Sequence, residues 1–202
     1  KAVACAKGNF LVTIGIKPKS PSTGYGYIKI SDRKKGYFLV NKFLEKPDKK
    51  KACRYFKDKR FFWNSGIFVW KASVFMEELK QNLPGLYSKI ITIRTAEDIE
   101  KVWPTIKPIS VDYGIMEQSK KIALIPANFY WTDVGSWDAL NAILPKDRYG
   151  NVIQADCLNL NSGDVSVFGR GGRLISVVGA KDIIIADTPD ALLVCNKNRT
   201  QD

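Results

Sequence analysis

Apolar residues recur along the chain with two different periods, and this pattern predicts a mixed α/β fold. Stretches rich in β-branched and aromatic residues predict strands. These stretches are NFLVTIGI (9–16), GYIKIS (26–31), YFLVNKFLEKP (37–47), WNSGIFVW (63–70) and KIALIPA (121–127). Helical spacing predicts helices. The predicted helices cover 48–59, 72–83, 96–103, 110–119 and 136–144. A Pro-Asp turn begins the first helix, and Pro84 ends the second.

Beyond Pro145 the pattern changes to short β-runs separated by turn residues. The runs are NVI, CLNL, DVSVF, LISVV, DIIIA and ALLVC, and the turns include NSGD, GRGG and TPD. We therefore expect two domains, an α/β part over residues 1–147 and a small all-β module over residues 148–202.

The composition excludes several classes of protein. The chain has 202 residues, of which 45% are hydrophobic and 26% charged, as in ordinary folded domains. No apolar run exceeds five residues, so we expect no membrane span. Histidine is absent, which excludes a His-based triad, a His general base and a His-ligated metal. The four cysteines are far apart and form no C-x-x-C pair, as expected for reduced thiols in a cytoplasmic protein.

The positive charge is concentrated at the start of the chain. The net charge is +12, and residues 1–60 hold 17 Lys and Arg against 4 Asp and Glu, an excess of 13. Such a segment suits a phosphorylated substrate, a nucleic acid or an anionic surface, and its alternative is a solvated face.

Two segments place polar groups at the ends of predicted strands. In PSTGYGYI, Gly24 and Gly26 let backbone amides approach a ligand closely, although paired glycines also mark bulges. In FLEKPD, the Glu45 carboxylate can accept from sugar hydroxyls, and the Lys46 ammonium can bind a phosphate. The alternative for Glu45 and Lys46 is an exposed, inert charge pair beside a turn.

Two more segments carry an amide and a carboxylate. In WNSGIFVW, Asn64 offers a donor and an acceptor for vicinal hydroxyls, or else it is a turn residue before a core strand. In FYWTDVGSW, Asp133 is a candidate ligand of Mg²⁺. Ser136 is better placed than Asp133 to cap the following helix.

Taken together and in this order, these segments resemble the sugar-nucleotide pyrophosphorylases, and specifically the mannose-1-phosphate guanylyltransferases. The resemblance rests on TGYGYI, EKPD, WNSGIF, SVDYGIMEQS and TDVGSW, together with the tail from GNVI to DTPDALLVC. It implies the C-terminal part of a Rossmann-like (GT-A-like) mixed sheet, followed by a β-module.

Three features depart from the family. Its G-x-G-x-R-x-x-P nucleotide loop and its first metal-binding aspartate are absent, so the resemblance implies a fragment or part of a split protein that is inactive alone. Gln118 stands where the family often has lysine.

The resemblance also implies the chemistry. Mannose 1-phosphate would attack the α-phosphorus of GTP and expel pyrophosphate, giving GDP-mannose for polysaccharide biosynthesis in the cytoplasm. Lys46 and Asp133 would be catalytic, with Asp133 binding Mg²⁺, and we expect both on one concave face. The implied substrate-binding residues are Gly24, Gly26, Tyr27, Glu45, Lys46, Asn64 and Asp112. Asp112 is equally explained as a helix N-terminal carboxylate. The family also admits a homodimer.

Two other functions remain open. One is a catalytically inactive regulatory or interaction subunit of the same fold. The other is a basic nucleic-acid-binding module, against which stands the absence of any RNP-like, KH-like or helix-turn-helix pattern. We expect no nucleic-acid partner and no membrane partner.

Overall fold

The computed structural model describes residues 1–135, 137–170 and 172–200, which form two compact units, Lys1–Trp131 and Thr132–Asp202. Ser136, the expected helix cap, lies outside the described residues. The expected domain boundary after residue 147 came from the change in sequence pattern, and it stays a prediction.

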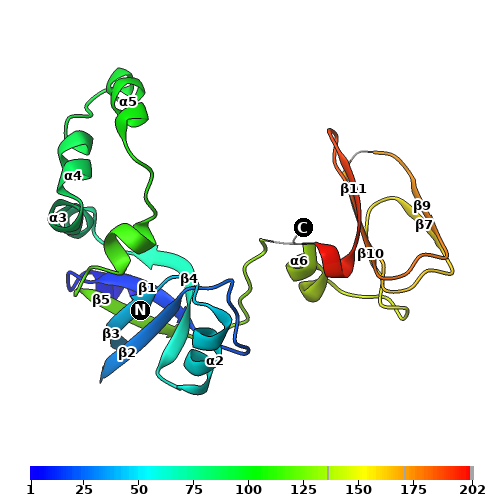
Figure 1. The fold of residues 1–202 in the computed structure, drawn as a ribbon, viewed down its shortest axis with the longest axis horizontal. Helices are drawn as coiled ribbons and strands as arrows, with labels where there is room; N and C mark the ends of the chain where they lie inside the picture. Colours follow the sequence, from blue (N-terminus) through cyan, green and yellow to red (C-terminus); the bar gives the residue numbers. More distant parts are fainter. Residues whose placement is uncertain (136, 171, 201–202) are drawn as a thin grey trace. The chain divides into compact units, whose positions relative to one another are not determined.

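A five-stranded mixed sheet forms the centre of the first unit (Figure 1). Its strands are β1 (Leu11–Ile16), β2 (Tyr27–Lys34), β3 (Tyr37–Leu44), β4 (Phe61–Val69) and β5 (Ile122–Ala127). They pair in the order β1-β4-β2-β3-β5 and close into a barrel through a parallel pairing of β1 with β5. The other neighbours are antiparallel. All five strands were predicted, with shifted ends.

The apolar runs of the sequence supply the core of this unit. Leu11, Ile28 and Leu124, from three different strands, are fully buried in one cluster. The end of β2 beside the hairpin turn, residues 31–34, is polar and exposed, and Gly36 has a φ of 90° in the turn. β2 is therefore buried where it crosses the core and exposed where it leaves it.

Short helices surround the sheet and form an arm of α3, α4 and α5 (Figure 1). Their bounds are α1 (Ala2–Ala6), α2 (Lys49–Lys57), α3 (Ala72–Asn82), α4 (Pro84–Ile90), α5 (Ala96–Val102), η1 (Trp103–Thr105) and η2 (Asp112–Met116). Asp48 caps α2 by accepting from Lys51 N–H, so the helix start predicted from the Pro-Asp turn is confirmed. Pro84 does end one helix, but it also begins α4, because proline fits the first turn of a helix. The sequence did not predict α1 or α4.

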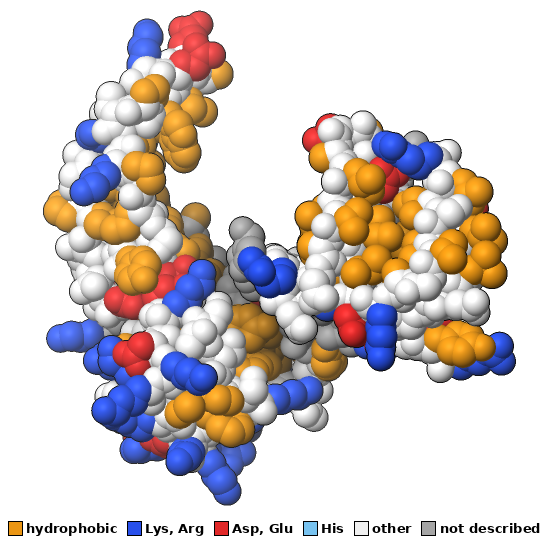
Figure 2. All heavy atoms as spheres, turned by 45° about the vertical axis from the view of Figure 1, so that its right-hand side comes forward, with side chains coloured by type: hydrophobic (Ala, Val, Ile, Leu, Met, Phe, Trp, Pro, Cys, Tyr) orange, Lys and Arg blue, Asp and Glu red, His pale blue; other side chains and the backbone are white. Residues whose placement is uncertain are grey.

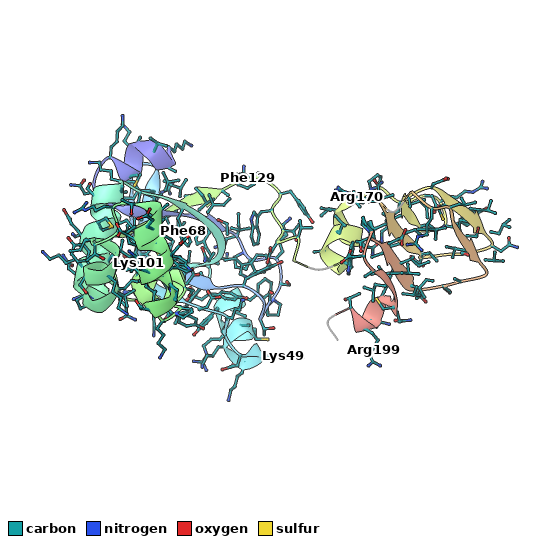
Figure 3. The ribbon with its side chains drawn as sticks, turned by 90° about the horizontal axis from the view of Figure 1, so that it is seen from above. Lys49, Phe68, Lys101, Phe129, Arg170 and Arg199 are labelled. Carbon is teal, nitrogen blue, oxygen red and sulfur yellow. The ribbon has the colours of Figure 1, made fainter. Side chains whose placement is uncertain are left out.

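The positive charge lies on the surface around α2 and the hairpin. Lys51 pairs with Asp48 at 3.0 Å, and Arg60 pairs with Asp58 at 2.8 Å. Lys49 projects away from α2 (Figure 3). Lys and Arg side chains are spread over the part of the first unit that carries α2 and the hairpin (Figure 2).

The second unit consists of short, mostly parallel strands that wind around a common axis, with the helix α6 beside them. It contains α6 (Trp137–Ile143), β6 (Val152–Gln154), β7 (Cys157–Leu160), β8 (Ser166–Gly169), β9 (Ile175–Val178), β10 (Ile183–Asp187), β11 (Leu192–Asn196) and η3 (Lys197–Arg199). From β6 to β10, successive strands alternate between a sheet ordered β11-β10-β8-β6 and a two-stranded sheet of β7 and β9. Only β11 pairs antiparallel among these neighbours in the described residues. The alternation of parallel strands between two sheets is the geometry of a β-helix.

Valines and isoleucines fill the space between these two sheets. Val165, Val167 and Val177 are buried in one cluster. A second cluster packs Trp137 and Leu140 of α6 against Phe168 and Ile184. The short strands predicted for residues 148–202 are therefore confirmed, with η3 in addition to them, and α6 corresponds to the helix predicted over 136–144.

None of the helices in the described parts of the chain is long and apolar enough to cross a membrane.

Candidate functional site

Four of the predicted segments meet in the first unit. Gly26 precedes β2, Glu45 follows β3, Asn64 lies in β4, and Asp112 begins η2. The backbone N–H of Asn64 donates to the Gly26 carbonyl at 2.8 Å. We call Glu45, Lys46, Asn64, Asp112 and Glu117 the Glu45 cluster, since each of them contacts Glu45 or another member of the group.

Asn64 is the residue that joins the sheet to η2. Its Nδ2 donates to Asp112 Oδ1 at 3.2 Å, and its Oδ1 accepts from Thr13 Oγ1 at 3.3 Å and from Gly66 N–H at 3.1 Å. These bonds use both lone pairs of the amide oxygen and one of the two N–H donors. Asn64 is therefore oriented by three bonds, and its second N–H can serve a ligand.

Glu45 is largely enclosed, whereas Lys46 is open to solvent. The Glu45 side chain is 14% exposed, that of Lys46 is 63% exposed, and the two charges are 3.8 Å apart. Burial raises the pKa of the Glu45 carboxyl above its ordinary value, and the charge of Asp112 raises it further, while Lys46 lowers it. The arrangement places a hydrogen-bond acceptor, the Glu45 carboxylate, beside the exposed Lys46 ammonium, which can reach toward a bound phosphate.

Asp112 has a similar environment at the start of η2. Burial raises its pKa, and the hydrogen bonds from its own backbone and from Asn64 act in the opposite direction. It is both the first residue of η2 and a partner of Asn64, so its position agrees with the explanation as a helix N-terminal carboxylate. Its part in binding substrate stays a prediction.

The glycine loop carries hydrogen bonds of its own and lies against the Glu45 carboxylate. A Cβ on Gly26 would lie 2.8 Å from Glu45 Oε2, so the glycine makes room for that carboxylate. Gly24 N–H donates to Ser22 Oγ at 3.2 Å within the loop. Tyr27 is fully buried, and its hydroxyl donates to the Ser22 carbonyl at 2.9 Å. The side chain of Tyr27 therefore supports the loop, and ligand contacts by Gly24, Gly26 and Tyr27 stay predictions.

An aromatic group lies beside this loop. The Tyr25 ring is 4.9 Å from the Trp63 ring and 5.2 Å from the Trp131 ring, both edge-on. Such contacts fix the position of the Gly24–Gly26 backbone.

Glu117 is the member of the cluster that we did not single out from the sequence. Its Oε1 accepts from the backbone N–H of Glu45 at 2.9 Å, across 72 positions. The only signal was its place within SVDYGIMEQS, because a hydrogen bond between such distant residues leaves no local pattern.

Asp133 is exposed and belongs to the second unit. Mg²⁺ prefers about six oxygen ligands, of which proteins usually supply one or two carboxylates. Asp133 fits one such position, but among the described residues no group of three Cys, Asp or Glu side chains could hold a metal ion. A magnesium site here would need oxygens from elsewhere, such as phosphate oxygens. The expectation that Asp133 and Lys46 share one face stays a prediction.

Comparison with known proteins identifies the family. Residues 1–149 match the Nucleotidyl transferase family, and residues 155–202 match the MannoseP isomerase/GMP-like beta-helix domain. The chain belongs to the nucleotidyl transferase family, and the predicted fold class, with its C-terminal β-module, is confirmed.

Named relatives show what the chain is similar to. It is 34% identical to the alginate biosynthesis protein AlgA of Pseudomonas fluorescens, covering 99% of this chain and 44% of that protein. It is 35% identical to a putative mannose-1-phosphate guanylyltransferase of Vibrio cholerae, covering 100% of this chain and 45% of that protein. The chain thus spans less than half the length of these relatives.

A solved structure agrees with the fold. The crystal structure described as mannose-1-phosphate geranyltransferase from Thermus thermophilus superposes with a TM-score of 0.85 at 27% identity. The match covers 98% of this chain and 59% of that one. The predicted resemblance to mannose-1-phosphate guanylyltransferases is confirmed by the names of the relatives.

Proposed function

We propose that this chain supplies the acceptor-sugar part of a mannose-1-phosphate guanylyltransferase, which transfers GMP from GTP to mannose 1-phosphate. The observation that carries the proposal is the Glu45 cluster, which brings two carboxylates, an amide and an exposed ammonium together in a nucleotidyl transferase fold. The choice of mannose 1-phosphate and of a guanine nucleotide as substrates is based on the names of the relatives.

The reaction asks the protein to orient two anions and to offset their charge. A phosphate oxygen of mannose 1-phosphate forms a bond to the α-phosphorus of GTP, and the bond from that phosphorus to the β-phosphate oxygen breaks. Pyrophosphate leaves with the electron pair, so no protein nucleophile is needed.

Four residues of the cluster would contact the acceptor directly. Glu45 and Asp112 accept hydrogen bonds from sugar hydroxyls, and the second N–H of Asn64 donates to a sugar oxygen. The Lys46 ammonium, 63% exposed, moves from its 3.8 Å contact with Glu45 to the acceptor phosphate.

Magnesium belongs to the proposal through Asp133. The ion would offset phosphate charge, with Asp133 as one ligand and phosphate oxygens among the others. A cytoplasmic location, a role in polysaccharide biosynthesis and a homodimer are further parts of the proposal, drawn from the family.

The 202 residues by themselves should bind the acceptor but should not turn over. They contain no G-x-G-x-R-x-x-P loop to hold the triphosphate. Pyrophosphate release from GTP and mannose 1-phosphate, measured with the homogeneous chain, should therefore equal the background without protein. Release above that background contradicts this expectation.

Calorimetric titration of the chain with mannose 1-phosphate tests the proposal. Saturable binding is expected, with weaker binding of mannose and of inorganic phosphate, because only the full ligand uses both the acceptors and Lys46. Glu45→Gln should weaken binding, whereas Glu100→Gln on α5, an exposed residue outside the cluster, should not. Equal affinities for all three ligands, or no effect of Glu45→Gln, would refute the assignment.

A second candidate is an inactive regulatory subunit of the same fold. It predicts sugar-phosphate binding without turnover even when the rest of the enzyme is supplied. A nucleic-acid module would instead bind duplexes with an affinity that falls steeply as salt rises.

A further inference from the structure

The turn that presents Lys46 is held in a conformation that its own residues do not favour. β3 ends at Leu44, and Lys46 has a φ of 24°, in a region that L-residues rarely adopt. Such a backbone persists where surrounding contacts fix it. The turn therefore depends on a contact from outside β3.

Glu117 makes that contact. Its Oε1 accepts from the N–H of Glu45 at 2.9 Å, directly before the strained residue. A hydrogen bond from a backbone N–H to a carboxylate is charge-assisted and stronger than a neutral one. Glu117 is itself anchored, because it directly follows η2 and its N–H donates to the Asp112 carbonyl at 2.9 Å.

The same contact connects three separate elements. Glu117 joins the end of β3 to η2, and Asp112 of η2 joins Asn64 of β4 through the 3.2 Å bond. These two hydrogen bonds thereby fix the side chains that would bind the sugar relative to the side chain that would bind the phosphate. If the Glu117 side chain is removed, the Glu45–Lys46 turn loses its hydrogen bond to η2.

We propose that Glu117 is a positioning residue for sugar-phosphate binding, which holds the Glu45–Lys46 turn without touching the ligand. The proposal rests on the function proposed above. The bond requires an oxygen acceptor at the length of a glutamate side chain, so reach and charge can be separated by substitution.

Three substitutions in the full 202-residue chain separate these properties. Glu117→Gln keeps the reach and an acceptor oxygen but removes the charge. Glu117→Asp keeps the charge but shortens the side chain by one methylene, and Glu117→Ala removes the acceptor. Glu100→Ala on α5 is the matched control, since Glu100 is exposed and lies outside the cluster.

Binding of mannose 1-phosphate is the first measurement. We expect Glu117→Ala and Glu117→Asp to raise Kd by about tenfold to a hundredfold, and Glu117→Gln by less than about threefold. Glu100→Ala should bind as wild type does. Wild-type affinity in Glu117→Ala, or a Gln variant as weak as the Ala variant, would overturn the proposal.

Amide hydrogen exchange at Glu45 is the second measurement and needs no ligand. The Glu45 N–H should be protected in wild type and in Glu117→Gln, and should exchange at least about tenfold faster in Glu117→Asp and Glu117→Ala. Rapid exchange of this amide in the wild type overturns the proposal even where a variant fails to fold. If wild type shows the protected amide but no affinity for mannose 1-phosphate, the proposed function fails while the hold on the turn stands.

Discussion

Gly26 and Gly24 lie two residues apart in one loop, yet alanine should be tolerated at only one of them. A Cβ on Gly26 would lie 2.8 Å from Glu45 Oε2 and 3.4 Å from both Asn64 Cβ and the Leu44 carbonyl oxygen. A Cβ on Gly24 would meet only Ser22 Oγ, at an ordinary 3.6 Å. Gly26→Ala is therefore the perturbation, and Gly24→Ala is its control in the same loop.

The distances set the size of the effect. Nonbonded atoms pack best at about 3.5–4.0 Å, so the Glu45 carboxylate must move by roughly 0.7 Å or more in Gly26→Ala. Moving a side chain off its rotamer costs about 0.5–1.5 kcal/mol of folding free energy. Loss of a charged hydrogen bond to a sugar hydroxyl costs about 1.5–3 kcal/mol of binding free energy, which weakens affinity by about tenfold to 150-fold.

Two assays separate binding from stability. Titration calorimetry with mannose 1-phosphate should show the loss of affinity in Gly26→Ala and wild-type affinity in Gly24→Ala. Thermal unfolding should show a Tm lowered by about 2–4 °C in Gly26→Ala, as expected for a loss near 1 kcal/mol in a chain of this size.

The reasoning has a clear point of failure. If Gly26→Ala unfolds a few degrees earlier but binds mannose 1-phosphate as well as Gly24→Ala does, the Glu45 carboxylate is not a ligand of the sugar. Equal loss of affinity in both variants would instead mean that the loop backbone contacts the ligand at both glycines.

Three further predictions concern the charges. Lys46→Ala should weaken the affinity for mannose 1-phosphate by about tenfold or more and leave the affinity for mannose unchanged. Parallel titrations with the two ligands measure both affinities. Since the pKa values of Glu45 and Asp112 are raised in the fold, acidification below neutral pH should protonate both earlier than free carboxyls and weaken sugar binding. The same proton uptake favours the folded state, and a pH series of Kd should be flatter for Glu45→Gln than for wild type. With mannose 1-phosphate present to supply phosphate oxygens, Mn²⁺ as a paramagnetic substitute for Mg²⁺ should broaden the NMR signals of residues 132–135 in wild type, and broadening that persists in Asp133→Asn would contradict the metal assignment.

Local chemistry determines much of the fold. The strands of the first unit are visible in the sequence because a β-strand that enters a core needs a run of branched and aromatic residues. The start of α2 is visible because Asp48 supplies the cap within three residues of the N–H that it accepts from. The short turns of the tail likewise predict many short strands, and the ordered motifs identify the family. In each case the cause lies within a few residues of its effect.

Helices that depend on their surroundings were harder to predict. The sequence predicts that a helix ends at Pro84 because proline interrupts backbone hydrogen bonding, yet the same property suits the first turn of α4. The choice between these two outcomes depends on what packs against residues 85–90. Leu86, Tyr87 and Ile90 do pack against the core cluster of the sheet.

The tertiary structure alone decided how the site is assembled. Glu45 and Asn64 could be named from the sequence, but the order in which β2, β3 and β4 pair brings them together. The sequence treats Gly24 and Gly26 alike, and only the position of the Glu45 carboxylate distinguishes them. Glu117 reaches Glu45 across 72 positions, and one hydrogen bond at that separation leaves no periodicity, spacing or composition by which a sequence could reveal it.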